Sequence, residues 1–169
     1  KPCVDFDALR CQTLADVTTN ADGISTLVWQ DQRFGSVPQL YLQSVMPDGQ
    51  LRWSNSMPVP TRSLVRYAQR SPKVATLGDD TWVAWSEDAN GVARIYLQQL
   101  DPAGNRVWPT PHSVSAGSDA QSNPALVVSP QADLFVGWET TPAGAPQIAL
   151  LRLNASGEPQ WPTPVSLSR

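Results

Sequence analysis

The stretch that decides the fold is WVAWSEDANGVARIYLQQLDPAGNRVW, from Trp82 to Trp108. It recurs twice with few gaps, as TLVWQDQRFGSVPQLYLQSVMPDGQLRW from residue 26 to 53 and as FVGWETTPAGAPQIALLRLNASGEPQW from residue 135 to 161. Every copy has a first tryptophan, a glycine, and a second tryptophan four residues after the glycine. These anchors are Trp29, Trp85 and Trp138, then Gly49, Gly104 and Gly157, then Trp53, Trp108 and Trp161. The chain is therefore three copies of one unit.

Each copy is predicted to form four short strands. The first strand is DVTTN, PKVAT or PALVVS, and the second ends on the first repeated tryptophan. The third is QLYLQSV, RIYLQQL or QIALLRL, in which hydrophobic residues alternate, and the fourth begins at the second tryptophan. A glycine-containing hairpin turn joins the third strand to the fourth, whereas the connection between second and third strands is longer and polar. No segment shows sustained helical spacing.

A repeated four-stranded unit of this length is typical of a β-propeller blade. We therefore expect an all-β fold of three four-stranded antiparallel propeller-type blades at residues 14–60, 70–115 and 122–168, after an N-terminal segment at 1–13. Propellers ordinarily have at least four blades, so the expected form is an incomplete or oligomer-closed β-propeller. The open flanks are covered in one of three ways: by further blades of a longer propeller, by a second copy that completes a six-bladed ring, or by a partner protein.

The repeat resembles those of bacterial secreted β-propellers of the sialidase-like and YVTN-like kind. In that pattern a W-x-D-x-R-x-G run is followed by IY-x-Q-x-L-D-x-x-G-x-x-x-W. The first copy matches the first run at Trp29, Asp31, Arg33 and Gly35. The second copy matches the second run at Ile95, Tyr96, Gln98, Leu100, Asp101, Gly104 and Trp108. The third copy departs most, with Ala149 and Asn154 at the tyrosine and aspartate positions. The resemblance implies a fold and no particular activity.

The charge of the chain argues against nucleic acid as a partner. The net charge is −3, the isoelectric point is near 5.0, and no basic run exceeds two residues. Duplex binding needs a clustered positive surface. No apolar stretch is long enough to span a membrane.

The two cysteines, Cys3 and Cys11, are separated by seven residues, and we expect them to form a local disulfide. Such a bond implies an oxidising compartment, so the predicted location is extracytoplasmic, either periplasmic or secreted. The alternative is a pair of free thiols. The only histidine, His112, is far from them, so no metal site or cofactor is expected.

The candidate binding residues lie on the connections between second and third strands, which gather on one face of a propeller. They are Asp31, Arg33, Glu87, Asp88 and Glu139. Glycoside hydrolysis needs a facing pair of carboxylates, which this placement permits without indicating one. Trp82 stands outside the repeat and is expected to be a solvent- or partner-facing anchor.

No catalytic residue is identified from the sequence. The leading hypothesis is a non-enzymatic extracytoplasmic interaction module, a structural or accessory subunit that docks on a larger assembly through a protein partner or by self-association. The alternative is a glycan-binding or glycan-cleaving propeller, sialidase-like, oligomeric or truncated.

Overall fold

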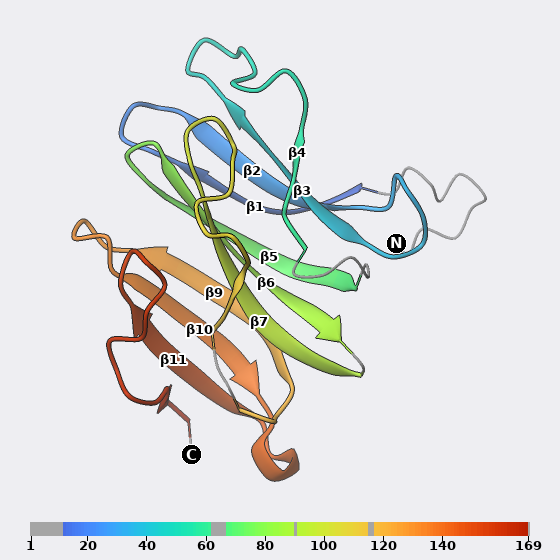
Figure 1. Cartoon of the computed structure of the whole chain (residues 1–169), viewed down its shortest axis with the longest axis vertical. Coiled ribbons are helices and arrows are strands. Elements are labelled where there is room, and N and C mark those ends of the chain that lie inside the picture. The colour runs from blue at the N-terminus through green and yellow to red at the C-terminus, as the bar shows by residue number, and fades with distance from the viewer. Residues whose placement is uncertain (1–11, 62–66, 90, 115–116, 169) are drawn as a thin grey trace.

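The computed structural model describes residues 12–61, 67–89, 91–114 and 117–168 of the chain. They form three separate four-stranded antiparallel sheets, each with its strands side by side in chain order. Figure 1 shows the sheets next to one another, with the second between the first and the third. The predicted fold class is thereby confirmed, and no sheet among the described residues joins the third unit back to the first.

Each sheet is one blade. Blade 1 contains β1 (Gln12–Thr19), β2 (Ser25–Asp31), β3 (Gln39–Val45) and β4 (Met57–Pro58). Blade 2 contains β5 (Ala68–Leu77), β6 (Asp80–Ala89), β7 (Val92–Leu100) and β8 (His112–Ser113). Blade 3 contains β9 (Gln121–Val128), β10 (Leu134–Thr140), β11 (Gln147–Leu153) and β12 (Val165–Ser166), with a short 3-10 turn at Pro142–Gly144.

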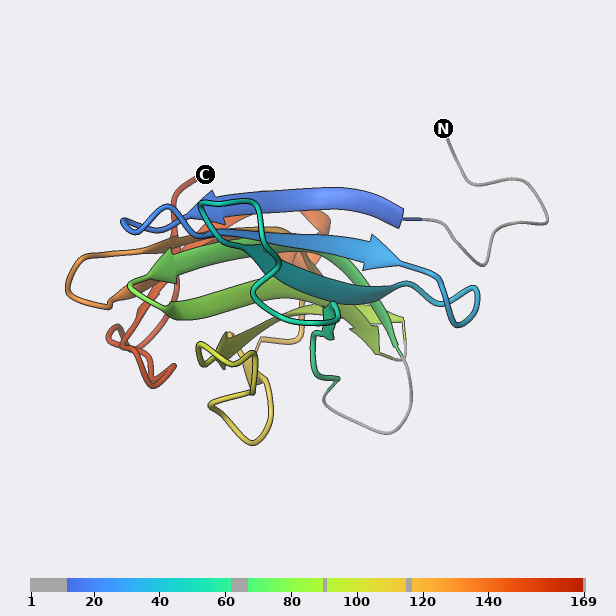
Figure 2. The same ribbon diagram turned by 90° about the horizontal axis from the view of Figure 1, so that it is seen from above.

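The first strands of the blades form the inner edge of the arc, because β1 lies against β5 and β5 lies against β9. Seen from above, the sheets overlie one another as stacked layers (Figure 2). A hydrophobic side chain on either face of blade 2 is therefore covered by a neighbouring blade.

Two apolar layers hold the blades together. Val83 and Trp85 of β6 belong to the layer between blades 1 and 2. Trp82 and Ala84 belong to the layer between blades 2 and 3. Successive residues of a strand point to opposite faces, so one strand supplies both layers.

The first strands begin earlier than the sequence pattern predicts. In blades 2 and 3 the predicted starts were Pro72 and Pro124, yet both strands extend several residues further back. A β-bulge interrupts the pairing at each proline: Ser71 and Pro72 both lie opposite Trp85, and the same arrangement occurs in blade 3. A bulge absorbs a residue that cannot donate to the ladder, so proline marks an irregularity inside the strand and not its start.

The fourth strands begin later than predicted. Each has two residues and starts four positions after the second tryptophan. That tryptophan follows the hairpin turn, two residues after an isolated bridge such as that between Leu100 and Arg106. The predicted disulfide between Cys3 and Cys11 falls on residues outside the described part of the chain. None of the described residues belongs to a helix long and apolar enough to cross a membrane.

Candidate functional site

One end of the blades gathers the polar residues that the sequence singled out. We call it the loop end: the end at which β2, β6 and β10 finish and β3, β7 and β11 begin. Strand register brings the starts of the first strands to the same end, because Gln12 pairs with Asp31 and Gln69 pairs with Glu87. In blade 3 the corresponding pair is Gln121 and Thr140.

Asp31 is the centre of a hydrogen-bonded cluster in blade 1. Its side chain is buried, and its Oδ2 accepts hydrogen bonds from Gln12 Nε2 at 2.8 Å and Trp29 Nε1 at 3.1 Å. The guanidinium of Arg33 donates to the same oxygen through Nε at 2.9 Å and Nη2 at 2.5 Å. The backbone N–H of Arg33 donates to Oδ1 at 2.8 Å.

The electrostatics of this cluster fix the charge of Asp31. Burial by itself raises the pKa of the carboxyl group, but the hydrogen bonds from Arg33, Trp29 and Gln12 outweigh it and lower the pKa from 3.8 to about 2. Hydrogen bonding to Asp31 in turn raises the pKa of Arg33. Asp31 is therefore a permanently ionised partner of Arg33 near neutral pH and is unsuited to exchange protons there.

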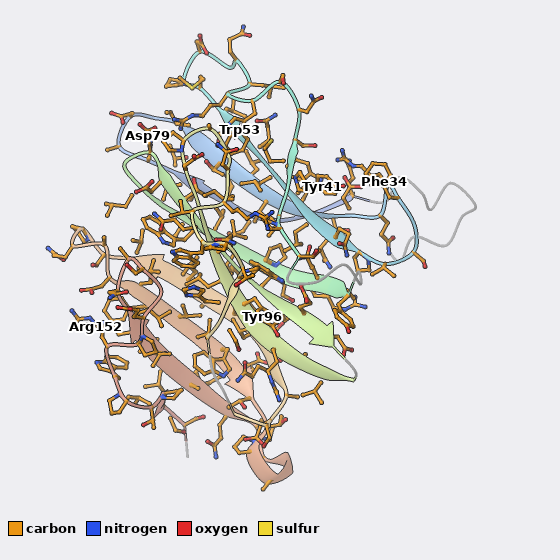
Figure 3. All side chains as sticks on the ribbon, in the orientation of Figure 1. Phe34, Tyr41, Trp53, Asp79, Tyr96 and Arg152 are labelled. Atoms are coloured by element: carbon orange, nitrogen blue, oxygen red, sulfur yellow. The ribbon has the colours of Figure 1, made fainter. Side chains whose placement is uncertain are left out.

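Arg33 also forms part of a partly exposed aromatic surface. Its guanidinium carbon lies 4.1 Å from the ring centroid of Tyr41, and the Trp29 and Tyr41 rings stack with centroids 6.4 Å apart. The neighbouring Phe34 is 71% exposed. Figure 3 shows Phe34 and Tyr41 toward the same end of blade 1.

Glu87 repeats the Asp31 arrangement in blade 2. It is buried, and its Oε2 accepts hydrogen bonds from Trp85 Nε1 at 3.3 Å and from Gln69 Nε2 at 3.5 Å. Asp31 and Glu87, two of the candidate binding residues, are therefore buried at the loop end and do not present their carboxylates to solvent. Asp88 is exposed.

A second polar cluster, which we call the inner cluster, joins blades 2 and 3 at the loop end. It consists of Ser71, Asn123 and Glu139. Ser71 Oγ donates to Asn123 Oδ1 at 3.4 Å, and Asn123 Nδ2 donates to Glu139 Oε2 at 2.9 Å. All three residues are on the surface, so this carboxylate is both held and accessible.

The bulges explain how the inner cluster arises. Ser71 and Asn123 have positive φ angles of 49° and 48°, which are uncommon for residues other than glycine. Both residues precede a proline in the bulge of a first strand. Bulges and such backbone conformations are enriched beside functional sites, where they redirect a side chain. Of the three residues, only Glu139 was a candidate from the sequence. Ser71 and Asn123 could have been found from the Ser-Pro and Asn-Pro dipeptides, which occur at the same position of two copies.

Trp82 is not the exposed anchor that we expected. It is 1% exposed and packs in the layer between blades 2 and 3. Its Nε1 is buried without a hydrogen-bond partner. Within the described residues no group of three or more His, Cys, Asp or Glu side chains is placed to hold a metal ion.

The fold is similar to that of several carbohydrate-active enzymes. An endo-arabinase from Bacteroides thetaiotaomicron superposes with a TM-score of 0.53 at 11% identity, over 83% of this chain and 55% of that one. A thermostable family-43 glycoside hydrolase gives 0.53 at 16% identity, over 88% and 57%. An arabinanase from Bacillus subtilis gives 0.51 at 11% identity, over 86% and 53%. No family model matches the chain, and no curated protein does.

These matches correct the functional hypothesis. The predictions of a non-enzymatic module and of no enzyme activity are contradicted, because the matching folds are those of glycoside hydrolases and favour the glycan-cleaving alternative. The resemblance to secreted propellers is confirmed at the level of the β-propeller, but not for sialidase-like or YVTN-like blades in particular. The chain spans little more than half the length of the structures it matches, and at these identities the similarity shows the fold alone.

Proposed function

We propose that the chain is part of a glycan-cleaving β-propeller that works outside the cytoplasm, with its loop end facing the carbohydrate. The observation that carries this proposal is the superposition of the chain on arabinan-cleaving and family-43 enzymes over more than four fifths of its length. The substrate class suggested by these neighbours is a polymer of arabinose. Since the chain covers only part of such a propeller, the activity is proposed for the assembled protein.

Glu139 is the carboxylate that we assign to the reaction. Glycoside hydrolysis uses two carboxyl groups on either side of the scissile bond, one of which moves a proton to or from the reacting oxygen. Glu139 is exposed at the loop end, and Asn123 holds one of its oxygens in place. Asp31 is excluded from proton transfer at neutral pH because Arg33 keeps it ionised.

The aromatic surface of blade 1 would supply sugar binding. The apolar face of a sugar ring packs against an aromatic side chain, and Phe34 is exposed for such a contact. The guanidinium of Arg33, fixed by Asp31 and Tyr41, offers donors to sugar hydroxyls nearby. Affinity electrophoresis in gels containing arabinan measures this binding, and Phe34→Ala is expected to weaken it.

The direct test of the proposal is the release of reducing ends from linear arabinan. Glu139→Gln removes the proposed proton-transfer group, and we expect the rate to fall about 100-fold or more. Asn123→Ala leaves the carboxylate in place but frees it to rotate, so a smaller fall, about tenfold, is expected.

The matched control is Glu158→Gln. Glu158 accepts a hydrogen bond of 2.9 Å from Asn154 Nδ2, the same length as that between Asn123 and Glu139, but it lies on a hairpin at the opposite end of the blade. This variant should retain the wild-type rate. A wild-type protein that neither binds arabinan nor releases reducing ends, or an active Glu139→Gln variant, would contradict the proposal.

A further inference from the structure

Neighbouring blades are joined by a contact that repeats along the chain. The outer tryptophan of one blade lies on the glycine hairpin of the next. A Cβ at Gly104 would lie 3.2 Å from Trp53 Cε2, and a Cβ at Gly157 would lie 3.2 Å from the six-membered ring of Trp108. Glycine is therefore required where the tryptophan of the preceding blade approaches the turn.

A glutamine makes a second repeated contact at the loop end. Gln69 Oε1 accepts the backbone N–H of Leu40 in blade 1 at 2.9 Å. Gln121 Oε1 accepts the backbone N–H of Ile95 in blade 2 at 3.0 Å. In each case a glutamine side chain of the first strand accepts a hydrogen bond from the backbone of the third strand in the blade before it.

The two open flanks of the arc each carry one half of these contacts. On the flank of blade 1, Gly49 has the same positive φ as Gly104 and nothing within 4 Å of its Cβ position, and Gln12 occupies the place of Gln69. On the flank of blade 3, Trp161 occupies the place of Trp53 but is only half-buried. The N–H of Ile148, equivalent to those of Leu40 and Ile95, donates to Ser168 Oγ at 2.8 Å.

Burial follows the same pattern on the flank of blade 3. Ile148 is 42% exposed, although Leu40 at the same position of blade 1 is fully buried. Leu167 is 60% exposed, although Val59 and Val114 at its position are buried.

On the flank of blade 1, Val17 is 53% exposed, although its counterpart Val74 is buried between blades 1 and 2. Each exposed residue is thus the unpaired half of a contact that is complete inside the arc. Exposed apolar surface of this kind marks an interaction site.

We propose that two copies of this chain associate head to tail, with the blade 3 flank of each copy on the blade 1 flank of the other. The chain itself carries both halves of the junction, so a second copy supplies what each flank lacks: Gly49 beneath Trp161, and Gln12 in place of Ser168 as the acceptor for Ile148. Two such junctions give six blades, a number within the range of closed propellers. The inference rests on the repeated contacts and not on the proposed activity.

The solution mass by multi-angle light scattering tests the proposal. The wild-type chain is expected to show about twice the 18.4 kDa of one copy. Val17→Glu and Leu167→Glu each place a charge in both junctions, and each is expected to give a monomer. The control is Val107→Glu, because Val107 is 47% exposed on the middle blade, away from both open flanks. This variant should stay dimeric.

Mixing the two flank variants distinguishes a specific junction from non-specific hydrophobic association. A Val17→Glu copy keeps its blade 3 flank, and a Leu167→Glu copy keeps its blade 1 flank, so one intact junction forms between them. The mixture is expected to recover a dimer that neither variant forms alone. A monomeric wild type, equal behaviour of Val17→Glu and Val107→Glu, or no recovery on mixing would overturn the proposal.

Discussion

The indole Nε1 of Trp53 donates a hydrogen bond of 3.2 Å to the carbonyl oxygen of Pro102. It joins the outer edge of blade 1 to the hairpin turn of blade 2, two residues before Gly104. Figure 3 labels Trp53 of blade 1 and, near it, Asp79, which lies in the β5–β6 turn of blade 2 and pairs with Arg52. Trp53 thus contacts this turn through a hydrogen bond and through its ring. Because the ring lies close to Gly104, the turn has little room for a larger residue at that position.

Gly104→Ala should therefore destabilise the protein more than the same change at Gly49. Both glycines have a positive φ, 85° and 86°, so the strain of an alanine there is equal. Only at Gly104 would the new methyl group press on Met57 and Trp53. We expect the free energy of unfolding to fall by about 1–3 kcal/mol more for Gly104→Ala than for Gly49→Ala, because overpacking costs that much.

Urea denaturation measures this difference. Both substitutions belong in a Val17→Glu background, so that association between copies does not contribute. Equal losses at the two glycines would show that the contact between Trp53 and the hairpin adds no constraint.

The ion pair of Asp31 and Arg33 should make stability depend on acid pH. The pKa of Asp31 is about 2 in the folded protein and near 3.8 in the unfolded chain. The ionised carboxylate thus stabilises the fold fully above about pH 4, and this contribution is lost as the pH falls from 4 to 2. The shift corresponds to a stabilisation on the order of 2 kcal/mol.

Asp31→Asn should remove this contribution. Unfolding midpoints for the wild type and the variant are expected to differ most at pH 5 to 7 and to converge toward pH 2. The control is Asp79→Asn, which breaks an exposed pair with Arg52 and should change stability by less than about 1 kcal/mol. A gap between wild type and Asp31→Asn that stays constant down to pH 2 would refute the assigned role of the carboxylate.

The two buried tryptophans of β6 should respond differently to phenylalanine. Trp85 Nε1 donates to Glu87, so Trp85→Phe leaves a buried carboxylate with one donor fewer. Trp82 Nε1 has no partner, so Trp82→Phe removes an unpaired buried N–H as well as some volume. We expect Trp85→Phe to cost about 1–2 kcal/mol more than Trp82→Phe.

Thermal or urea unfolding of the two variants measures this difference in the free energy of unfolding. Both side chains are buried to the same degree, which makes them a matched pair for volume. A larger loss for Trp82→Phe would mean that its indole makes packing contacts that outweigh the unpaired donor.

The repeat made much of the fold predictable. The spacing of Trp85, Gly104 and Trp108 predicts a second strand, a hairpin and a fourth strand, and all three are present in the structure. Their bounds differ from the prediction, because β6 runs on from Trp85 to Ala89 and β8 begins at His112, four residues after Trp108. The bulges could not be predicted from the sequence, because a proline is equally compatible with the start of a strand and with a bulge inside one.

The site was less predictable, because burial in this fold does not follow polarity. Alternation along β6 suggested that one face of the strand meets solvent, and Trp82 was assigned to it. In a stack of blades both faces meet another sheet, so Trp82 and Trp85 are equally buried. Glu87 is buried for the same reason, and only its strand position beside Gln69 shows that it has a donor. Asp88 and Glu139, the penultimate residues of β6 and β10, are exposed.

The burial of blade 2 on both faces has a consequence for how the chain tolerates change. Blades that touch only their neighbours share stability as a row of coupled units, so a substitution in the middle unit weakens two junctions and one at an end weakens a single junction. The third copy has drifted furthest from the repeat, with Ala149 for tyrosine, Leu151 for glutamine and Thr140 for the buried acid. Within a single copy, tolerance to substitution is therefore expected to be lowest in the middle blade, whereas the proposed association of two copies would give each end blade its second junction.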